Sequence, residues 1–156
     1  MKIENIISLF DFDNFDYCYH MTEKGIGDLI CEEGLLVDGT NIKGVKNIKD
    51  TTTIDITPDM VSSLEDFIDF VEGEVNSNLI RDTSEMVIIG SPKGFDKKIV
   101  SDYSQTIDDH YYQGLINKNL IMGYIDDTLT FIPNENYAFG NDEFEDYLYE
   151  NDRLTY

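Results

Sequence analysis

The stretch YCYHMTEKGIGDLICEEGLL (Tyr17–Leu36) places a short aromatic run directly before a pattern typical of a capped helix. The aromatic run predicts a strand over 16–21. Thr22 then stands where a helix N-cap is expected, and Gly34 stands where a left-handed residue ends a helix. The apolar stripe of this helix consists of Ile26, Leu29 and Ile30. The segment therefore predicts a strand followed at once by a helix.

Gly25 and Gly27 lie in the first turn of this predicted helix. Each weakens the turn by up to about 1 kcal/mol relative to alanine. Because glycine has no side chain, both positions leave the helix backbone open to close approach by another group. His20, at the end of the aromatic run, poses the functional question: it either holds a ligand or fills the core.

Apolar periodicity predicts further elements before and after this segment. A short helix is expected over 3–10, with Ile3, Ile6, Ile7 and Phe10 on one face. A strand over 52–57 leads into a helix over 58–72, which Thr57 caps and Gly73 ends. The buried face of that second helix is expected to hold Met60, Val61, Leu64, Phe67, Ile68 and Val71.

The remaining elements predict the fold class. A short helix is expected near 76–80, a buried strand over 85–90, and a hairpin over 120–132 that turns at Asp126 and Asp127. These elements make one α+β domain over 1–140, with a mixed or antiparallel core sheet and flanking helices. Residues 141–156 are expected to form an acidic tail that is amphipathic at most.

Negative charge dominates the composition, because 32 Asp and Glu against 11 Lys and Arg leave a formal net charge of −21. Such a surface repels nucleic acid and anionic membranes, so direct binding to either is not expected. The charge has two open explanations. One is solubility, and the other is an acidic inhibitor that imitates nucleic acid and blocks a basic nucleic-acid-binding protein. The carboxylates suited to such a role are Asp59, Glu65, Asp66, Asp69, Glu72, Asp142, Glu143, Glu145, Asp146 and Glu150.

The sequence also indicates where the protein works. No apolar run approaches the roughly 18 residues of a membrane span or the roughly 7 to 15 residues of a secretion signal. Cys18 and Cys31 form no CxxC pattern, and no histidine lies at metal-ligand spacing from them. We therefore expect a cytoplasmic protein with two reduced thiols and no bound metal.

Four short patterns occur along the first part of the chain in a recognisable order. They are YHMT (Tyr19–Thr22), EEGLL (Glu32–Leu36), the loop GTNIKGVKNIKD (Gly39–Asp50) and TPDMVSSL (Thr57–Leu64). In this order they resemble the ADP-ribosyltransferase-like fold of many small bacterial and phage proteins. The resemblance covers about 17–64, with a fainter echo at 121–137.

The resemblance implies a cleft that binds NAD in a bent form. His20 matches the motif histidine, whose ring hydrogen-bonds the adenosine-side ribose, and Thr22 lies beside it at the mouth. Thr57 matches the hydroxyl residue against which the nicotinamide ring packs. An imidazole and a hydroxyl suit a ribose diol, because both make directional hydrogen bonds. The cations expected to counter the pyrophosphate are Lys43, Lys46 and Lys49.

The chain departs from the family at the third motif, where the transferases carry a Glu at the start of a late strand. In LINKNLIMGYID (Leu115–Asp126), Asn117 and Asn119 stand at that position. An amide cannot supply the negative charge that stabilises an oxocarbenium-like centre. Glu85 and Glu135 are available, but neither matches the position. The resemblance therefore implies an NAD- or nucleotide-binding domain and leaves ADP-ribosyl transfer as an open question.

The histidines also have simpler interpretations. A lone histidine on an apolar strand is often a core residue whose hydrogen bonds are satisfied, and this remains the alternative for His20. His110 follows two aspartates that favour its charged form, so we expect it on the surface.

Overall fold

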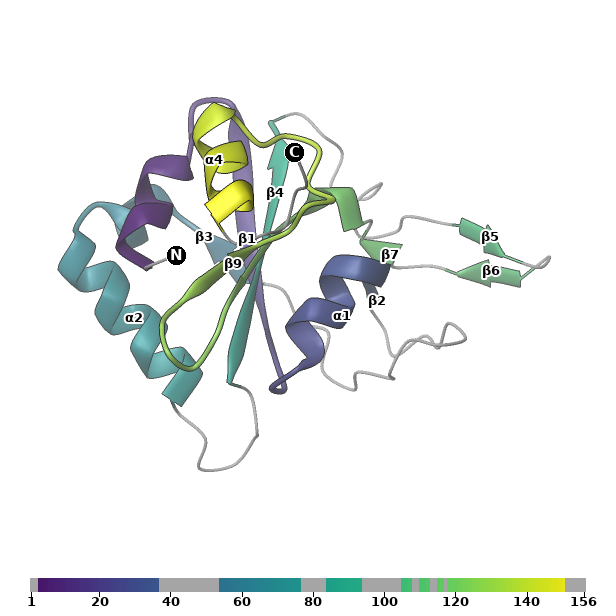
Figure 1. The fold of residues 1–156 in the computed structure, drawn as a ribbon, viewed down its shortest axis with the longest axis horizontal. Coiled ribbons are helices and arrows are strands. Elements are labelled where there is room, and N and C mark those ends of the chain that lie inside the picture. The colour runs from purple at the N-terminus through teal and green to yellow at the C-terminus, as the bar shows by residue number, and fades with distance from the viewer. Residues whose placement is uncertain are drawn as a thin grey trace.

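The computed structural model describes residues 3–36, 54–76, 84–93, 105–107, 110–112, 115–116 and 118–150. A five-stranded antiparallel sheet with the strand order β3-β1-β4-β8-β9 forms its centre, and helices lie on both faces (Figure 1). The strands are β1 (Phe15–Thr22), β3 (Ile54–Ile56), β4 (Glu85–Pro92), β8 (Ile121–Ile125) and β9 (Phe131–Pro133). The predicted α+β architecture is therefore confirmed, as are the predicted strands at these places.

The register between β1 and β4 organises the sheet. The two strands pair along their whole length, from Phe15 opposite Pro92 to Thr22 opposite Glu85. Because side chains alternate along a strand, Tyr17 and Tyr19 face one side of the sheet. Cys18, His20 and Thr22 face the other side. Each side carries a separate apolar core.

Three helices cover the face that carries Tyr17 and Tyr19. They are the 3₁₀-helix η1 (Ile3–Leu9), α2 (Leu64–Asn76) and α4 (Asp142–Glu150). Phe67 of α2, Phe131 of β9 and Phe144 of α4 are buried together in this core. The buried residues of η1 are Ile3, Ile6 and Leu9, a spacing of three that follows from 3₁₀ geometry.

The opposite face is covered by α1 (Ile26–Glu33) and by short elements beside it (Figure 1). β2 (Leu35–Leu36) pairs with β7 (Leu115–Ile116), and the 3₁₀-helix η3 (Lys118–Leu120) leads into β8. Ile30, Leu35, Val87, Ile89 and Ile121 form the centre of this core. β5 (Gln105–Ile107) pairs with β6 (His110–Tyr112) in a separate two-stranded antiparallel sheet.

The start of α1 differs from the prediction, because Thr22 does not cap it. β1 continues through Thr22, which pairs with Glu85, and the N-cap position belongs to Gly25. Gly25 has a φ of 87°, a left-handed conformation that glycine adopts without strain. The predicted C-terminal end is confirmed: Gly34 has a φ of 93°, and its N–H donates to the carbonyl of Ile30.

The predicted helix over 58–72 forms two helices instead of one. A 3₁₀-helix, η2 (Pro58–Val61), is separated from α2 by Ser62 and Ser63. The break moves the buried stripe to Phe67, Val71 and Val75, so Leu64 is 44% exposed rather than buried. Gly73 lies inside α2, where no other atom would meet a side chain, and does not end the helix.

Several predictions lie wholly or partly outside the described residues. The lysine loop after β2 and the short helix expected over 76–80 belong to this group, apart from Asn76, which ends α2. Residues 142–150 of the acidic segment form α4, and its Phe144 and Leu148 belong to the same core as Phe67.

Candidate functional site

His20 and Thr22 lie side by side on one face of β1. His20 is 1% exposed and Thr22 is 3% exposed, so both side chains are almost fully covered. The face that they share is the one on which α1 packs. The strand thus brings together two of the residues that the sequence predicted for a ribose site.

Glu85 joins this pair through the register of the sheet. It stands directly opposite Thr22 on β4, while His20 stands opposite Val87. His20 and Glu85 are therefore diagonal neighbours on the same face, a relation in which long side chains can meet. Glu85 is only 5% exposed, although a glutamate side chain is rarely buried unless its carboxylate has a partner. His20, Thr22 and Glu85 form the cluster that we call the β1–β4 polar cluster.

The first turn of α1 holds the Glu85 carboxylate. The backbone N–H of Gly27 donates to Oε1 of Glu85 at 2.8 Å, and the backbone of Gly25 makes a second hydrogen bond to the same side chain. These N–H groups have no partner within the helix, so an acceptor from outside must satisfy them. Glu85 thus takes the capping role that the sequence assigned to Thr22.

Close packing at Gly27 makes this arrangement tight. A Cβ atom at this position would lie 2.6 Å from Cγ of Tyr124 and 2.8 Å from Oε1 of Glu85. Both distances are too short for a real side chain, so only glycine fits. The predicted close approach to this backbone is real, and the protein's own carboxylate and tyrosine make it.

Burial raises the pKa of Glu85 above its ordinary value of 4.5. The hydrogen bonds from Gly27 and Gly25 lower the pKa and offset part of this effect, while the charges of Asp28 and Asp126 raise it further. A raised pKa means that the folded protein binds the proton more tightly than the unfolded chain does. As the pH rises and Glu85 becomes charged, its carboxylate should therefore lower the free energy of unfolding.

This pKa predicts the pH dependence of the variant Glu85→Gln. As the pH rises from 4.5 through the raised pKa, the free energy of unfolding of the wild type should fall relative to that of Glu85→Gln, because the wild type must then bury a charged carboxylate. Urea unfolding of both proteins at several values between pH 4 and pH 8 measures the difference. Glu32→Gln, which removes an exposed acid from α1, serves as the control. A difference between wild type and Glu85→Gln that stays constant with pH would argue against the raised pKa.

Thr57 lies far from the β1–β4 polar cluster. It follows Ile56, which pairs with Tyr17, so it stands level with Asp16, four residues along β1 from His20. At about 3.4 Å per residue this separation is roughly 14 Å along the strand. Thr57 is exposed at the start of η2. Lys43, Lys46 and Lys49 lie outside the described residues.

The third-motif position carries no acid in the part of the chain that the structure describes. Asn119 is exposed in η3, two residues before β8 begins, and its carbonyl accepts the N–H of Ala138 at 2.9 Å. Asn117 lies outside the described residues. The acid nearest to His20 in the sheet register is Glu85, which does not match the third-motif position. Its one signal was an acid at the head of an otherwise apolar strand, EMVIIG.

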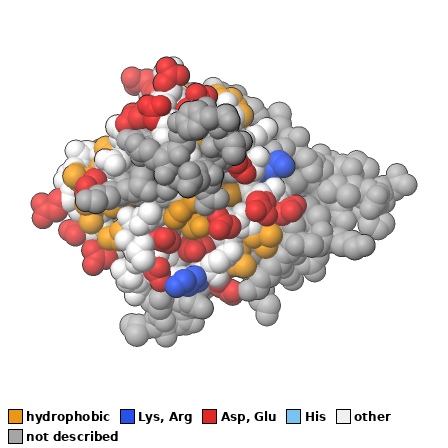
Figure 2. All heavy atoms as spheres, in the orientation of Figure 1, with side chains coloured by type: hydrophobic (Ala, Val, Ile, Leu, Met, Phe, Trp, Pro, Cys, Tyr) orange, Lys and Arg blue, Asp and Glu red, His pale blue; other side chains and the backbone are white. Residues whose placement is uncertain are grey.

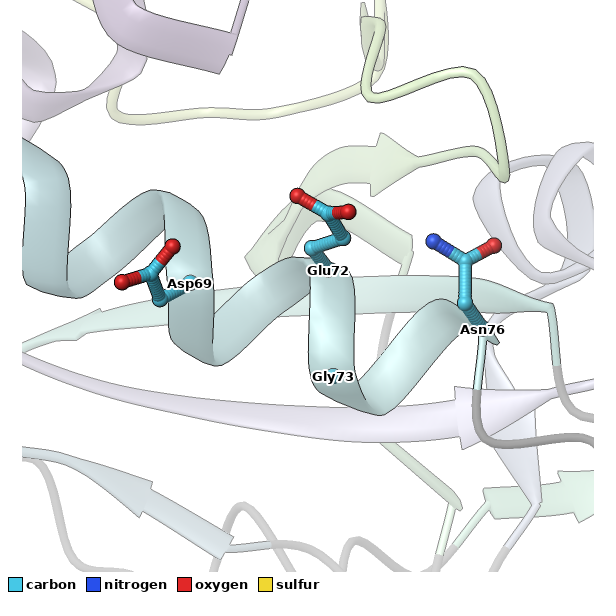
Figure 3. A pocket seen from close by; sticks show the side chains of 4 residues that line it. All are labelled: Asp69, Glu72, Gly73 and Asn76. Atoms are coloured by element: carbon cyan, nitrogen blue, oxygen red, sulfur yellow. The ribbon is translucent and has the colours of Figure 1, made fainter.

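The acidic side chains form a second candidate surface. Glu65, Asp66, Asp69 and Glu72 are exposed along α2. Asp69, Glu72, Gly73 and Asn76 line a shallow hollow of about 360 Å³, with the three longer side chains rising from the same helix (Figure 3). Figure 2 shows Asp and Glu spread over much of the coloured surface on one face of the molecule. An acidic inhibitor needs exposed carboxylates, and these carboxylates are exposed. Their positions do not identify a partner.

Among the described residues, no group of three or more His, Cys, Asp or Glu side chains is placed to hold a metal ion. Among the same residues, no helix has the length and apolar character needed to cross a membrane.

Comparison of the chain with protein-family models, with curated proteins and with solved structures finds no match.

Proposed function

We propose that this domain binds NAD or a related nucleotide on the sheet face that carries His20 and Thr22, in the manner of the ADP-ribosyltransferase-like fold. The observation that carries the proposal is the shared orientation of these two side chains on β1, immediately before α1. An imidazole and a hydroxyl that point the same way offer both donors and acceptors to a ribose diol. The strand-then-helix order over Tyr17–Leu36 further supports the resemblance.

Burial sets a condition on this binding. Because His20 and Thr22 are almost fully covered, a ribose reaches them only in molecules where the cover has moved. The apparent affinity is then lower than the intrinsic affinity by the fraction of open molecules. We therefore expect weak binding of free NAD, with dissociation constants on the order of 0.1 to 1 mM, in the range of about −4 to −5.5 kcal/mol.

The same site is poorly equipped for transfer. Asn119 is an amide, and Glu85 is already engaged by the first turn of α1. A buried carboxyl with a raised pKa is a weaker source of negative charge than an ionised one. The proposed function is therefore nucleotide binding without efficient ADP-ribosyl transfer.

Thermal unfolding in the presence of NAD tests the proposal. At 10 mM, which is about ten to a hundred times this dissociation constant, NAD should add about 1.4 to 2.7 kcal/mol to the free energy of unfolding, a shift of several degrees in the melting temperature. Thr22→Val removes the hydroxyl at similar volume, and His20→Gln replaces the imidazole ring by an amide whose donor and acceptor are placed differently. Both variants should therefore lose most of this shift. His110→Gln changes the only other histidine and should keep the shift. Circular dichroism spectra establish that each variant is folded.

Two outcomes would refute nucleotide binding at this face. One is an unchanged melting temperature at 10 mM NAD and at 10 mM ADP-ribose. The other is an equal shift in the wild type, Thr22→Val and His20→Gln.

An acidic inhibitor of a basic nucleic-acid-binding protein is the second candidate. The exposed carboxylates along α2 favour it, because carboxylates on a rigid helix can occupy a groove that normally binds phosphates. Binding to such a partner should weaken steeply with salt. It should also be lost when Glu65, Asp66, Asp69 and Glu72 become Gln or Asn, a change that leaves the response to NAD intact.

A further inference from the structure

A small cavity lies at the end of the sheet near the start of α4, on the face opposite the β1–β4 polar cluster. Its volume is about 90 Å³. Phe15 and Tyr17 of β1, Tyr137 and Phe139 of the segment after β9, and Phe144 of α4 line it. Aromatic side chains from three separate parts of the chain thus meet around one space.

The planes of these aromatic rings are inclined to one another and are not parallel. Phe15 and Phe139 have ring centroids 5.9 Å apart at an angle of 61°. Tyr137 meets Phe139 at 5.9 Å and 73°, and it meets Phe144 at 5.3 Å and 59°. Each of these pairs is in edge-to-face or tilted contact, so the four rings follow one another along the lining of the cavity. Several ring faces and edges therefore border the same cavity.

A carboxylate also lines the cavity. Asp11 belongs to the lining and is exposed to solvent. Its backbone N–H donates to the Tyr17 hydroxyl at 2.9 Å, and its Oδ2 accepts a hydrogen bond from the Asn14 side chain at 2.9 Å. These two bonds hold Asp11 against the aromatic wall. An aromatic cavity with a carboxylate at its border is complementary to a cation with an apolar surface.

The wider charge distribution favours the same kind of ligand. The chain carries a formal net charge of −21, so its field concentrates cations near the surface. The N-terminal end of α4 adjoins the cavity and carries a partial positive charge. Asp142, Glu143 and Glu145 in the first turn of α4 offset that charge.

We propose that this aromatic cavity binds a small quaternary ammonium compound through its trimethylammonium group. The volume suits that group alone, since 90 Å³ corresponds to about three water molecules at about 30 Å³ each. Ring faces attract the cation electrostatically, and Asp11 adds a full negative charge. A primary ammonium is strongly hydrated and loses more on entering such a space, so methylated amines are preferred.

Titration with choline tests this site, and 3,3-dimethylbutan-1-ol is the matched neutral compound because it has the same shape without the charge. Isothermal calorimetry at constant ionic strength should show choline binding at least about tenfold more tightly than the alcohol. Equal binding of the two compounds, or no binding of choline at 50 mM, overturns the proposal.

Three variants locate the binding. Phe139→Leu keeps an apolar side chain at a position that is 37% exposed, and it should weaken choline binding roughly threefold to thirtyfold. Asp11→Asn should weaken it several-fold, whereas Asp13→Asn, which changes an exposed acid outside the cavity lining, should change it less than twofold. Choline binding that is equal in Phe139→Leu and wild type places the site elsewhere and overturns the proposal.

Discussion

Replacing Gly123 with alanine is expected to lower the free energy of unfolding by about 3 to 5 kcal/mol. Gly123 has a φ of 152°, in a region that residues with a side chain rarely adopt. A Cβ atom there would overlap the carbonyl oxygen of Ile132 and lie 2.9 Å from both Cζ of Phe131 and Cα of Pro133. Backbone strain and overpacking therefore act together at this position.

The surrounding sheet explains why Gly123 has this conformation. Gly123 is opposite Ile88, whereas Ile121 is opposite Ile89, so Met122 is an extra residue in β8. Such a bulge bends a strand and places glycine where another strand comes close. Alanine at this position forces β8 away from β9, and the loss extends to the core on both faces.

Urea unfolding of Gly123→Ala measures this loss, and Gly73→Ala is its matched control. Gly73 lies inside α2, and no atom within 4 Å would meet its Cβ. Alanine there should raise the free energy of unfolding by about 0.5 to 1 kcal/mol, because alanine favours the helix and restricts the unfolded chain. If both variants changed stability equally, the bulge geometry would be refuted.

The sequence predicted those parts of the fold that depend on neighbouring residues. The aromatic run before His20 predicted β1, and the apolar run EMVIIG predicted β4. Both predictions were possible because a strand has a residue pattern within a few consecutive positions. Predictions failed where contacts between residues far apart in the sequence determine where an element begins or ends. Thr22 stays in β1 because Glu85 pairs with it, and Leu64 is exposed because α2 starts after the break at Ser62 and Ser63.

The candidate site shows the same division. The alternation of β1 was enough to predict that His20 and Thr22 share a face. The role of Glu85 depends on the pairing of β1 with β4, two strands that are separated by more than sixty positions in the sequence. A pattern within either strand cannot reveal that pairing. The burial of His20 is what a core residue requires, and the response of His20→Gln to NAD distinguishes the core role from the ribose role.

Replacing Phe144 with alanine is expected to lower the free energy of unfolding by about 3 to 5 kcal/mol. Phe144 is 2% exposed and belongs to the core that contains Phe67 and Phe131. Its ring lies 5.3 Å from that of Tyr137, so the substitution removes an aromatic contact and also leaves a void. Chemical denaturation monitored by far-ultraviolet circular dichroism measures the change. Because a typical domain is stable by only about 5 to 15 kcal/mol, this loss is roughly a fifth or more of the total stability.

The sequence predicted that residues 141–156 form an acidic tail outside the domain. The size of the loss in Phe144→Ala decides between such a tail and a segment that belongs to the domain. A side chain on a detached tail contributes almost nothing to folding, so Phe144→Ala would then stay within about 0.5 kcal/mol of the wild type. Asp146→Ala, at an exposed position of the same helix, should show that small change in either case. A large loss in Phe144→Ala beside a negligible one in Asp146→Ala would show that α4 is needed to complete the core. The carboxylates of α4 would then stand on a fixed surface, as an acidic inhibitor requires, rather than on a freely moving chain.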